Sequence, residues 1–198
     1  MPHIDYFFST LSPFTYLAGN RLEEIAEARG ATITYKPMDI LALFPRTGGI
    51  VPQERHPSRL EYRMQEIKRW AKKTGMPMNP RPAHSPTNAA PSSYAIIAAQ
   101  LSGGNVGPLV QAFLRAGWAE EKDIARDDVV RECLGNCGFD PSLADSGLLT
   151  GAETYAANLE EAVKRGVFGS PFYITDTDER FWGQDRLADL DAHLAGKL

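Results

Sequence analysis

The chain has 198 residues, a formal net charge of −4 and 43% hydrophobic residues, which is an ordinary globular composition. An acidic chain lacks the basic excess of most nucleic-acid-binding proteins, so we expect no nucleic-acid partner. Apolar runs such as residues 94–99 are too short to cross a bilayer, so we expect no membrane segment. The N-terminus lacks a basic segment followed by an apolar one, which predicts no signal peptide and a cytoplasmic protein.

The first 38 residues have the pattern strand, helix, strand. Residues 3–9 are rich in aromatic and β-branched types, which are typical of a strand. Ser12-Pro13 marks a helix start, and Gly30 is a natural stop for one helix between them. Residues 32–38 predict a second strand. This order predicts a parallel βαβ unit with a right-handed crossover.

The middle of the chain, from about residue 55 to residue 165, has helical patterns and few strand signals. One face of a charge-rich helix that ends near Gly75 carries Leu60, Met64, Ile67 and Ala71. A stretch rich in proline, residues 76–91, predicts a loop. Further helices are expected over residues 92–102, 106–118, 127–137 and 151–165.

The two cysteines, Cys133 and Cys137, are separated by three residues and do not form a Cys-x-x-Cys motif. No second ligand cluster lies nearby to complete a zinc site, so we expect no metal centre. A disulfide is not expected in a cytoplasmic chain. The simplest interpretation is two small, half-buried residues near the end of a helix that stops at Gly138.

The C-terminal part returns to an alternating pattern. Residues 167–174 are apolar and aromatic, and a turn separates them from a short partner strand at residues 180–182. A last helix carries Leu187, Leu190 and Leu194 on one face. The order βαβ, helices, then ββα predicts an α/β fold: a thioredoxin-like domain (residues 1–45 and 160–198) interrupted by an all-helical insertion (residues 46–159).

The start of the first helix is the first candidate site. A helix N-terminus offers unpaired N–H groups and a partial positive charge, which favour an anion such as a thiolate. Thioredoxin-like redox proteins place Cys-x-x-Cys here, and Ser12 and Thr15 hold the two cysteine positions, which excludes dithiol–disulfide exchange. A serine hydroxyl can donate a hydrogen bond to the sulfur of another molecule and so lower the pKa of that thiol. Lowering the thiol pKa by about two stabilises the thiolate relative to the thiol by about 2.7 kcal/mol. Taken alone, the tetrapeptide favours a plain helix cap.

Two further motifs bear on this site. Ser170-Pro171 stands where thioredoxin-like folds carry a cis-proline. A cis bond here would expose the backbone N–H and C=O of Ser170 to a peptide-like ligand. The alternative is an ordinary proline at the start of a strand. Asp185 precedes the last helix, where it either caps the helix or pairs with a ligand ammonium group.

Three motifs together resemble one known family: residues 8–18 (Phe-Ser-Thr-Leu-Ser-Pro-Phe-Thr-Tyr-Leu-Ala), residues 167–171 (Val-Phe-Gly-Ser-Pro) and residues 182–187 (Trp-Gly-Gln-Asp-Arg-Leu). With Arg69-Trp70-Ala71, they resemble the 2-hydroxychromene-2-carboxylate isomerases. These enzymes act in aromatic catabolism, belong to the DsbA-like group and are related to the kappa-class glutathione transferases. The resemblance covers nearly the whole chain and implies glutathione as the cofactor. The residues that it implies around glutathione are Ser12 at the sulfur, Ser170 and Pro171 at the backbone, and Gln184, Asp185 and Arg186 at the γ-glutamyl end.

The chain also departs from the family pattern. Gln184 stands where relatives commonly have Asn, and residues 47–49 are Thr-Gly-Gly where relatives often have Thr-Gly-Asn. Some relatives use a lysine near this position that has no clear match in this chain, and Arg46 is a candidate replacement for it. His84 falls near a ligand-contacting position of relatives, and a solvated loop residue is an equally good interpretation. The candidate substrate contacts are Phe14, Arg46, Arg59 and His84, with Arg186 as a further candidate for the substrate carboxylate.

The resemblance implies a reaction in which glutathione thiolate adds reversibly to the unsaturated carbon of an aromatic 2-oxo acid derivative. Bond rotation and elimination then give the isomer, so Ser12 is expected to be the catalytic residue that tunes the thiol. The expected partners are glutathione, a small aromatic substrate and a second copy in a homodimer. Two alternatives stay open: a kappa-like glutathione transferase or peroxidase, and a non-catalytic glutathione-binding protein.

Overall fold

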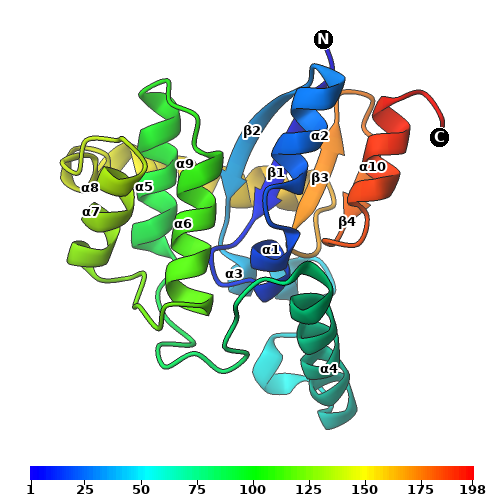
Figure 1. The fold of residues 1–198 in the computed structure, drawn as a ribbon, viewed down its shortest axis with the longest axis horizontal. Helices are drawn as coiled ribbons and strands as arrows, with labels where there is room; N and C mark the ends of the chain where they lie inside the picture. The colour runs from blue at the N-terminus through cyan, green and yellow to red at the C-terminus, as the bar shows by residue number, and fades with distance from the viewer.

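The computed structural model describes residues 1–198 and contains a four-stranded sheet with the strand order β2-β1-β3-β4 (Figure 1). The parallel pair is β1 (His3–Phe8) and β2 (Thr32–Pro37). The antiparallel part is β3 (Phe172–Thr175), which pairs with β1, and β4 (Arg180–Trp182), which pairs with β3. The predicted thioredoxin-like arrangement, a βαβ unit and a C-terminal hairpin that share one sheet, is confirmed.

The crossover between β1 and β2 holds two helices, where the sequence predicts one. They are α1 (Pro13–Ala18) and α2 (Arg21–Arg29). The single-helix prediction is wrong because Gly19 takes a positive φ of 61° and its N–H bonds to the Tyr16 carbonyl, which ends α1. The expected stop at Gly30 is confirmed by its left-handed backbone.

The remaining helices follow the predicted order closely. They are α3 (Ile40–Arg46), a 3₁₀ turn (Pro52–Glu54), α4 (Pro57–Thr74), α5 (Ala90–Leu101), α6 (Gly107–Trp118), α7 (Asp127–Asn136), α8 (Leu143–Ser146), α9 (Leu148–Lys164) and α10 (Leu187–Leu194). Helix α3 has no counterpart in the sequence prediction; it begins where the Asp39 carboxylate accepts bonds from the N–H groups of Leu41 and Ala42. None of the helices combines the length and apolar character that a transmembrane segment needs.

The two faces of β1 belong to two different apolar clusters, as the alternation of a strand requires. Ile4, Tyr6 and Phe8 face the larger cluster, which continues into α1, α2, α5, α6 and α7. Phe7 faces the smaller one, which includes residues of α3 and the end of α9, such as Ala162. The proposed domain boundary at residue 160 therefore falls inside α9, whose last turns pack on the sheet while its first turns lie among the other helices (Figure 1).

Helix α9 lies close against α5 because Gly151 has no side chain. A Cβ added at Gly151 would lie 2.7 Å from the Cβ of Tyr94 and 2.9 Å from its Cα. We expect Gly151→Ala to lower the free energy of unfolding by about 1–3 kcal/mol, since α9 must move away from α5. The matched control is Gly135→Ala in α7, whose Cβ would meet only Pro141 at 3.6 Å and should be neutral or stabilising by up to about 1 kcal/mol. Urea denaturation of both variants measures the difference, and equal midpoints would refute the close contact.

Candidate active site

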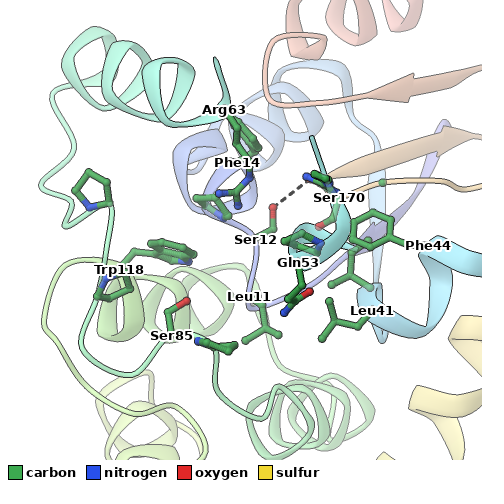
Figure 2. A pocket seen from close by; sticks show the side chains of 18 of the residues that line it. Leu11, Ser12, Phe14, Leu41, Phe44, Gln53, Arg63, Ser85, Trp118 and Ser170 are labelled. Carbon is green, nitrogen blue, oxygen red and sulfur yellow. Dashed lines mark hydrogen bonds between the residues drawn. The ribbon is translucent and has the colours of Figure 1, made fainter. Parts of the chain in front are cut away.

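Ser12 both caps α1 and reaches across to the third strand. It is almost completely buried, and its Oγ accepts a hydrogen bond from the Thr15 N–H at 3.2 Å. The same hydroxyl donates to the carbonyl oxygen of Ser170 at 3.1 Å (Figure 2). The cap interpretation is therefore confirmed, and the same side chain lies against the second predicted motif.

The Ser170-Pro171 peptide bond is cis, as the sequence analysis expected. The Ser170 side chain accepts a hydrogen bond from the Ser9 N–H at 2.9 Å and shares another with the Thr15 hydroxyl at 2.8 Å. Thr15 is fully buried, so the second former cysteine position now holds the Ser170 side chain in place. The backbone N–H groups of Phe14 and Ser170 make no hydrogen bond within the chain, which leaves two donors beside the Ser12 hydroxyl.

Ser12 lines a cavity of about 560 Å³, a size typical of sites for small ligands (Figure 2). The start of α1, helix α3, the 3₁₀ turn, α4, the proline-rich loop and the segment before β3 all contribute to its wall. The aromatic side chains among the lining residues are Phe14, Phe44, Trp118 and Trp182. The cavity thus opens between the sheet domain and the inserted helices.

The proline-rich loop that forms one wall is anchored at both of its ends. The Asn79 N–H donates to the carbonyl of Trp118 at 2.7 Å. The Ala83 N–H donates to the carboxylate of Glu121 at 2.7 Å, and this bond is the main cause that lowers the pKa of Glu121. Farther along, the Thr87 hydroxyl donates to Asp123. These bonds tie the loop to the end of α6 and to the segment that follows it, and so fix this part of the cavity wall.

The charged residues that line the cavity are all basic: Arg55, Arg63 and Arg81. The guanidinium of Arg63 lies 5.8 Å from the ring centre of Phe14, and that of Arg55 lies 5.1 Å from the ring centre of Phe44. No Asp or Glu lines this cavity. The electrostatics therefore favour an anionic ligand with an apolar body.

Three of the predicted site residues, Ser12, Phe14 and Ser170, line the cavity, and Pro171 follows directly. Three others lie outside this lining. Arg46 forms a two-pronged ion pair with Glu160 on the surface, at 2.5 and 2.8 Å. Arg59 is exposed on α4, and His84 lines a small neighbouring cavity of about 30 Å³. None of these three side chains lines the cavity that contains Ser12.

The segment Gln184–Arg186 also lies outside the lining, directly after Trp182, which is part of it. Gln184 is buried, and its carbonyl accepts a hydrogen bond from Arg21 at 2.8 Å. The alternative in which Asp185 caps the last helix is wrong, because Arg186 holds the cap position of α10 and no side chain caps it. The Asp185 carboxylate is half exposed, with one oxygen 3.6 Å from Arg186.

Sequence reasoning missed all three arginines in the wall, of which Arg55 and Arg63 are half-buried and Arg81 is exposed. Arg63 had a usable signal: it precedes Ile67, the buried residue of α4, by four positions and so shares the face that points to the body of the protein. No sequence signal points to Arg55, because its position depends on the path of the loop between α3 and α4. Trp118 was likewise missed, since it lies at the end of α6, a helix whose apolar residues are buried in the core.

Comparisons with known proteins identify the family of this chain. The family model described as DSBA-like thioredoxin domain matches residues 3–195. A 2-hydroxychromene-2-carboxylate isomerase of Sphingobium xenophagum is 30% identical over 198 residues, which cover 96% of this chain and 97% of the relative. A solved structure of a 2-hydroxychromene-2-carboxylate isomerase superposes with a TM-score of 0.79 at 28% identity, covering 98% of this chain and 95% of that one.

A more distant similarity points in the same direction. Glutathione S-transferase kappa 1 of Caenorhabditis elegans is 31% identical over 83 residues, which cover 41% of this chain and 36% of that protein. The match to the family model and to the isomerases extends over nearly the full length, whereas the match to the transferase is partial. The chain therefore belongs to the DsbA-like thioredoxin family and, within it, to the family of the 2-hydroxychromene-2-carboxylate isomerases.

Proposed function

We propose that this protein is a glutathione-dependent isomerase of 2-hydroxychromene-2-carboxylate or a similar aromatic 2-oxo acid derivative. The observation that carries the proposal is the serine at the position of a redox cysteine, hydrogen-bonded to Ser170 in the wall of a basic, aromatic-lined cavity. Such a site cannot form a disulfide and can hold the thiol of another molecule. The near full-length similarity to isomerases supports the reaction class, and the partial similarity to a kappa transferase supports glutathione.

The hydrogen bonds around Ser12 suggest how glutathione is activated. A hydroxyl has one proton, and the proton of Ser12 is engaged with the carbonyl of Ser170 while its oxygen accepts from Thr15. In our proposal, the cysteinyl N–H of glutathione takes over the Ser170 carbonyl, and the Ser170 N–H donates to the ligand in return. The Ser12 proton then turns to the sulfur, where it and the Phe14 N–H stabilise the thiolate.

The reaction itself needs no redox partner. The thiolate sulfur adds to the unsaturated carbon conjugated with the substrate carbonyl, and the electron pair of the double bond moves toward that carbonyl oxygen. The former double bond then rotates as a single bond, and expulsion of the thiolate restores the double bond in the other geometry. In the proposed site, Gln184, Asp185 and Arg186 surround the γ-glutamyl end, and the cavity holds the aromatic partner.

Calorimetry with glutathione and an isomerisation assay test the proposal together. We expect glutathione to bind, isomerisation to require it, and S-methylglutathione to bind without supporting turnover. Robust conjugation of a generic electrophile, without isomerisation, would assign the protein to the transferases instead. Absence of glutathione binding would overturn the proposal.

Two further parts of the proposal concern the cellular location and the oligomeric state of the protein. We place the enzyme in the cytoplasm, where glutathione keeps thiols reduced and where its two cysteines remain free. We also expect a homodimer, as the family resemblance implies. Light scattering on the purified protein measures the oligomeric state, and a monomer at working concentration would contradict that part alone.

A further inference from the structure

Three arginines line the cavity, and none of them has an acidic partner; Arg55 and Arg63 are half-buried, whereas Arg81 is exposed. No carboxylate contributes to the pKa of Arg63 or Arg55, whose pKa values are lowered by burial and by a neighbouring arginine in each case. No Asp or Glu lines the cavity into which they point (Figure 2 shows Arg63). Most other arginines of this chain are paired, as Arg46 is with Glu160 and Arg131 is with Asp127 and Asp145. A half-buried, unpaired guanidinium retains its charge and gains most from an anionic partner.

Both side chains are held in position by contacts that leave donors free. The Arg63 guanidinium lies over the Phe14 ring and makes no hydrogen bond within the chain. The Arg55 guanidinium lies over the Phe44 ring and uses only its Nε, which donates to the carbonyl of Ile50 at 2.8 Å. Stacking on a ring restricts the orientation of the planar guanidinium, so the free N–H groups form a fixed fork.

We propose that Arg63, assisted by Arg55, is the carboxylate-binding subsite of the cavity and selects planar aromatic acids over neutral aromatic compounds. A guanidinium fork matches a carboxylate with two parallel hydrogen bonds. The ring walls around it, Phe14 and Phe44, suit a flat apolar body. Arg63 and Arg55 therefore replace Arg46 and Arg59 as the residues that we assign to the substrate carboxylate.

Glutathione itself carries carboxylates, so both the tripeptide and the substrate can supply an anion to Arg63. Phe14, the ring beneath Arg63, lies two residues after Ser12, where the proposed function places the sulfur. A carboxylate on Arg63 is then close to the reacting carbon, which fits the acid of the substrate rather than a distant end of the tripeptide. The assignment of the source rests on the proposed function, whereas the binding of a carboxylate by Arg63 does not.

The test is the affinity of 2-naphthoate and of its neutral analogue 2-naphthamide, measured by calorimetry without glutathione. We expect 2-naphthoate to bind the unchanged protein, and Arg63→Gln to weaken it by about 10- to 100-fold, the range for a lost hydrogen bond to a charged group. Arg63→Lys should recover part of the affinity, because it keeps the charge and loses the fork. Binding of 2-naphthamide should be weaker and unaffected by Arg63→Gln.

The control is Lys68→Gln, which removes an exposed positive charge from the same helix and should change the affinity less than about twofold. Circular dichroism and urea denaturation establish that each variant is folded. An affinity for 2-naphthoate that does not depend on Arg63 overturns the proposal, as does Arg63→Gln weakening glutathione while leaving 2-naphthoate unchanged. If 2-naphthoate responds as expected and glutathione does not bind at all, the subsite stands and the proposed function fails.

Discussion

Replacement of Ser12 by alanine is expected to lower glutathione-dependent turnover by about 100-fold or more, the size of effect that follows the loss of one donor to a developing anion. The Ser12 hydroxyl lies in the cavity wall, where its hydrogen bond to the carbonyl of Ser170 holds it in place as a donor. Without it, the sulfur keeps only backbone donors, and the thiol of bound glutathione is less ionised near neutral pH. The measurement is the dependence of kcat/KM on pH, whose rising limb should move to higher pH in the variant.

Alanine at this position also removes the cap of α1, which costs about 0.5–2 kcal/mol of stability. Two variants separate the cap from the catalytic role. Ser12→Thr keeps a hydroxyl and should keep most of the activity. Ser146→Ala removes a hydroxyl that bonds only to the carbonyl of Ser142, and it should change neither the stability nor the activity. A pH profile of Ser12→Ala that equals that of the unchanged protein would exclude a role of Ser12 at the sulfur.

The largest expected effect on stability follows from Ile67→Ala. Helix α4 is 18 residues long, projects from the body of the protein in Figure 1, and has Ile67 as its one buried residue. Truncation of a fully buried isoleucine removes apolar contacts and leaves a cavity, which costs about 2–5 kcal/mol. The free energy of unfolding in urea measures this loss. Because Arg63 lies one turn earlier on the same face, the affinity for aromatic carboxylates should fall as well.

Leu60→Ala is the matched control on the same helix. The Leu60 side chain is 39% exposed, so its truncation should change the free energy of unfolding by less than about 0.5 kcal/mol. The two positions were indistinguishable in the sequence, where both belong to the apolar face of the helix. Equal losses from the two variants would mean that α4 is held by its other half-buried residues, such as Trp70, whose ring lies 5.3 Å from the Arg21 guanidinium.

The elements that depend on local pattern were predictable from the sequence. The strands at both ends, the helix that ends at Gly75 and the serine cap of α1 follow from alternation, glycine stops and side-chain capping. The cis Ser170-Pro171 bond was expected from the order of the elements rather than from the dipeptide itself. Ser12, Phe14 and Ser170 could therefore be brought together as a candidate site before their geometry was known.

What depends on long-range packing was not predictable. The break at Gly19 needs the backbone conformation of that glycine. The sequence analysis assigned no element to the segment of α3, which contains Pro45 near its end. The cavity wall is assembled from segments far apart in the chain. No local pattern therefore places Arg55 beside Phe44, or Trp118 in the same cavity wall as Ser12. Choosing substrate cations from motif position alone selected Arg46, which the fold pairs with Glu160.

The protein offers a favourable background for a measurement of the thiol of bound glutathione. Its own two thiols stay protonated near neutral pH, because burial raises the pKa of Cys133 to about 12 and raises that of Cys137. Neither cysteine lies at a helix start or in a disulfide, so neither competes with the ligand as a thiolate. Any thiolate that absorbs in the ultraviolet at neutral pH therefore comes from glutathione.

The pKa of the glutathione thiol in the complex, followed by thiolate absorbance between about pH 5 and pH 9, tests the central claim most directly. The account predicts a pKa about two below the ordinary thiol value of roughly 8.5 in the unchanged protein, and a return toward that value in Ser12→Ala. A bound thiol that titrates like free glutathione, or one whose lowered pKa survives the loss of the Ser12 hydroxyl, would contradict it.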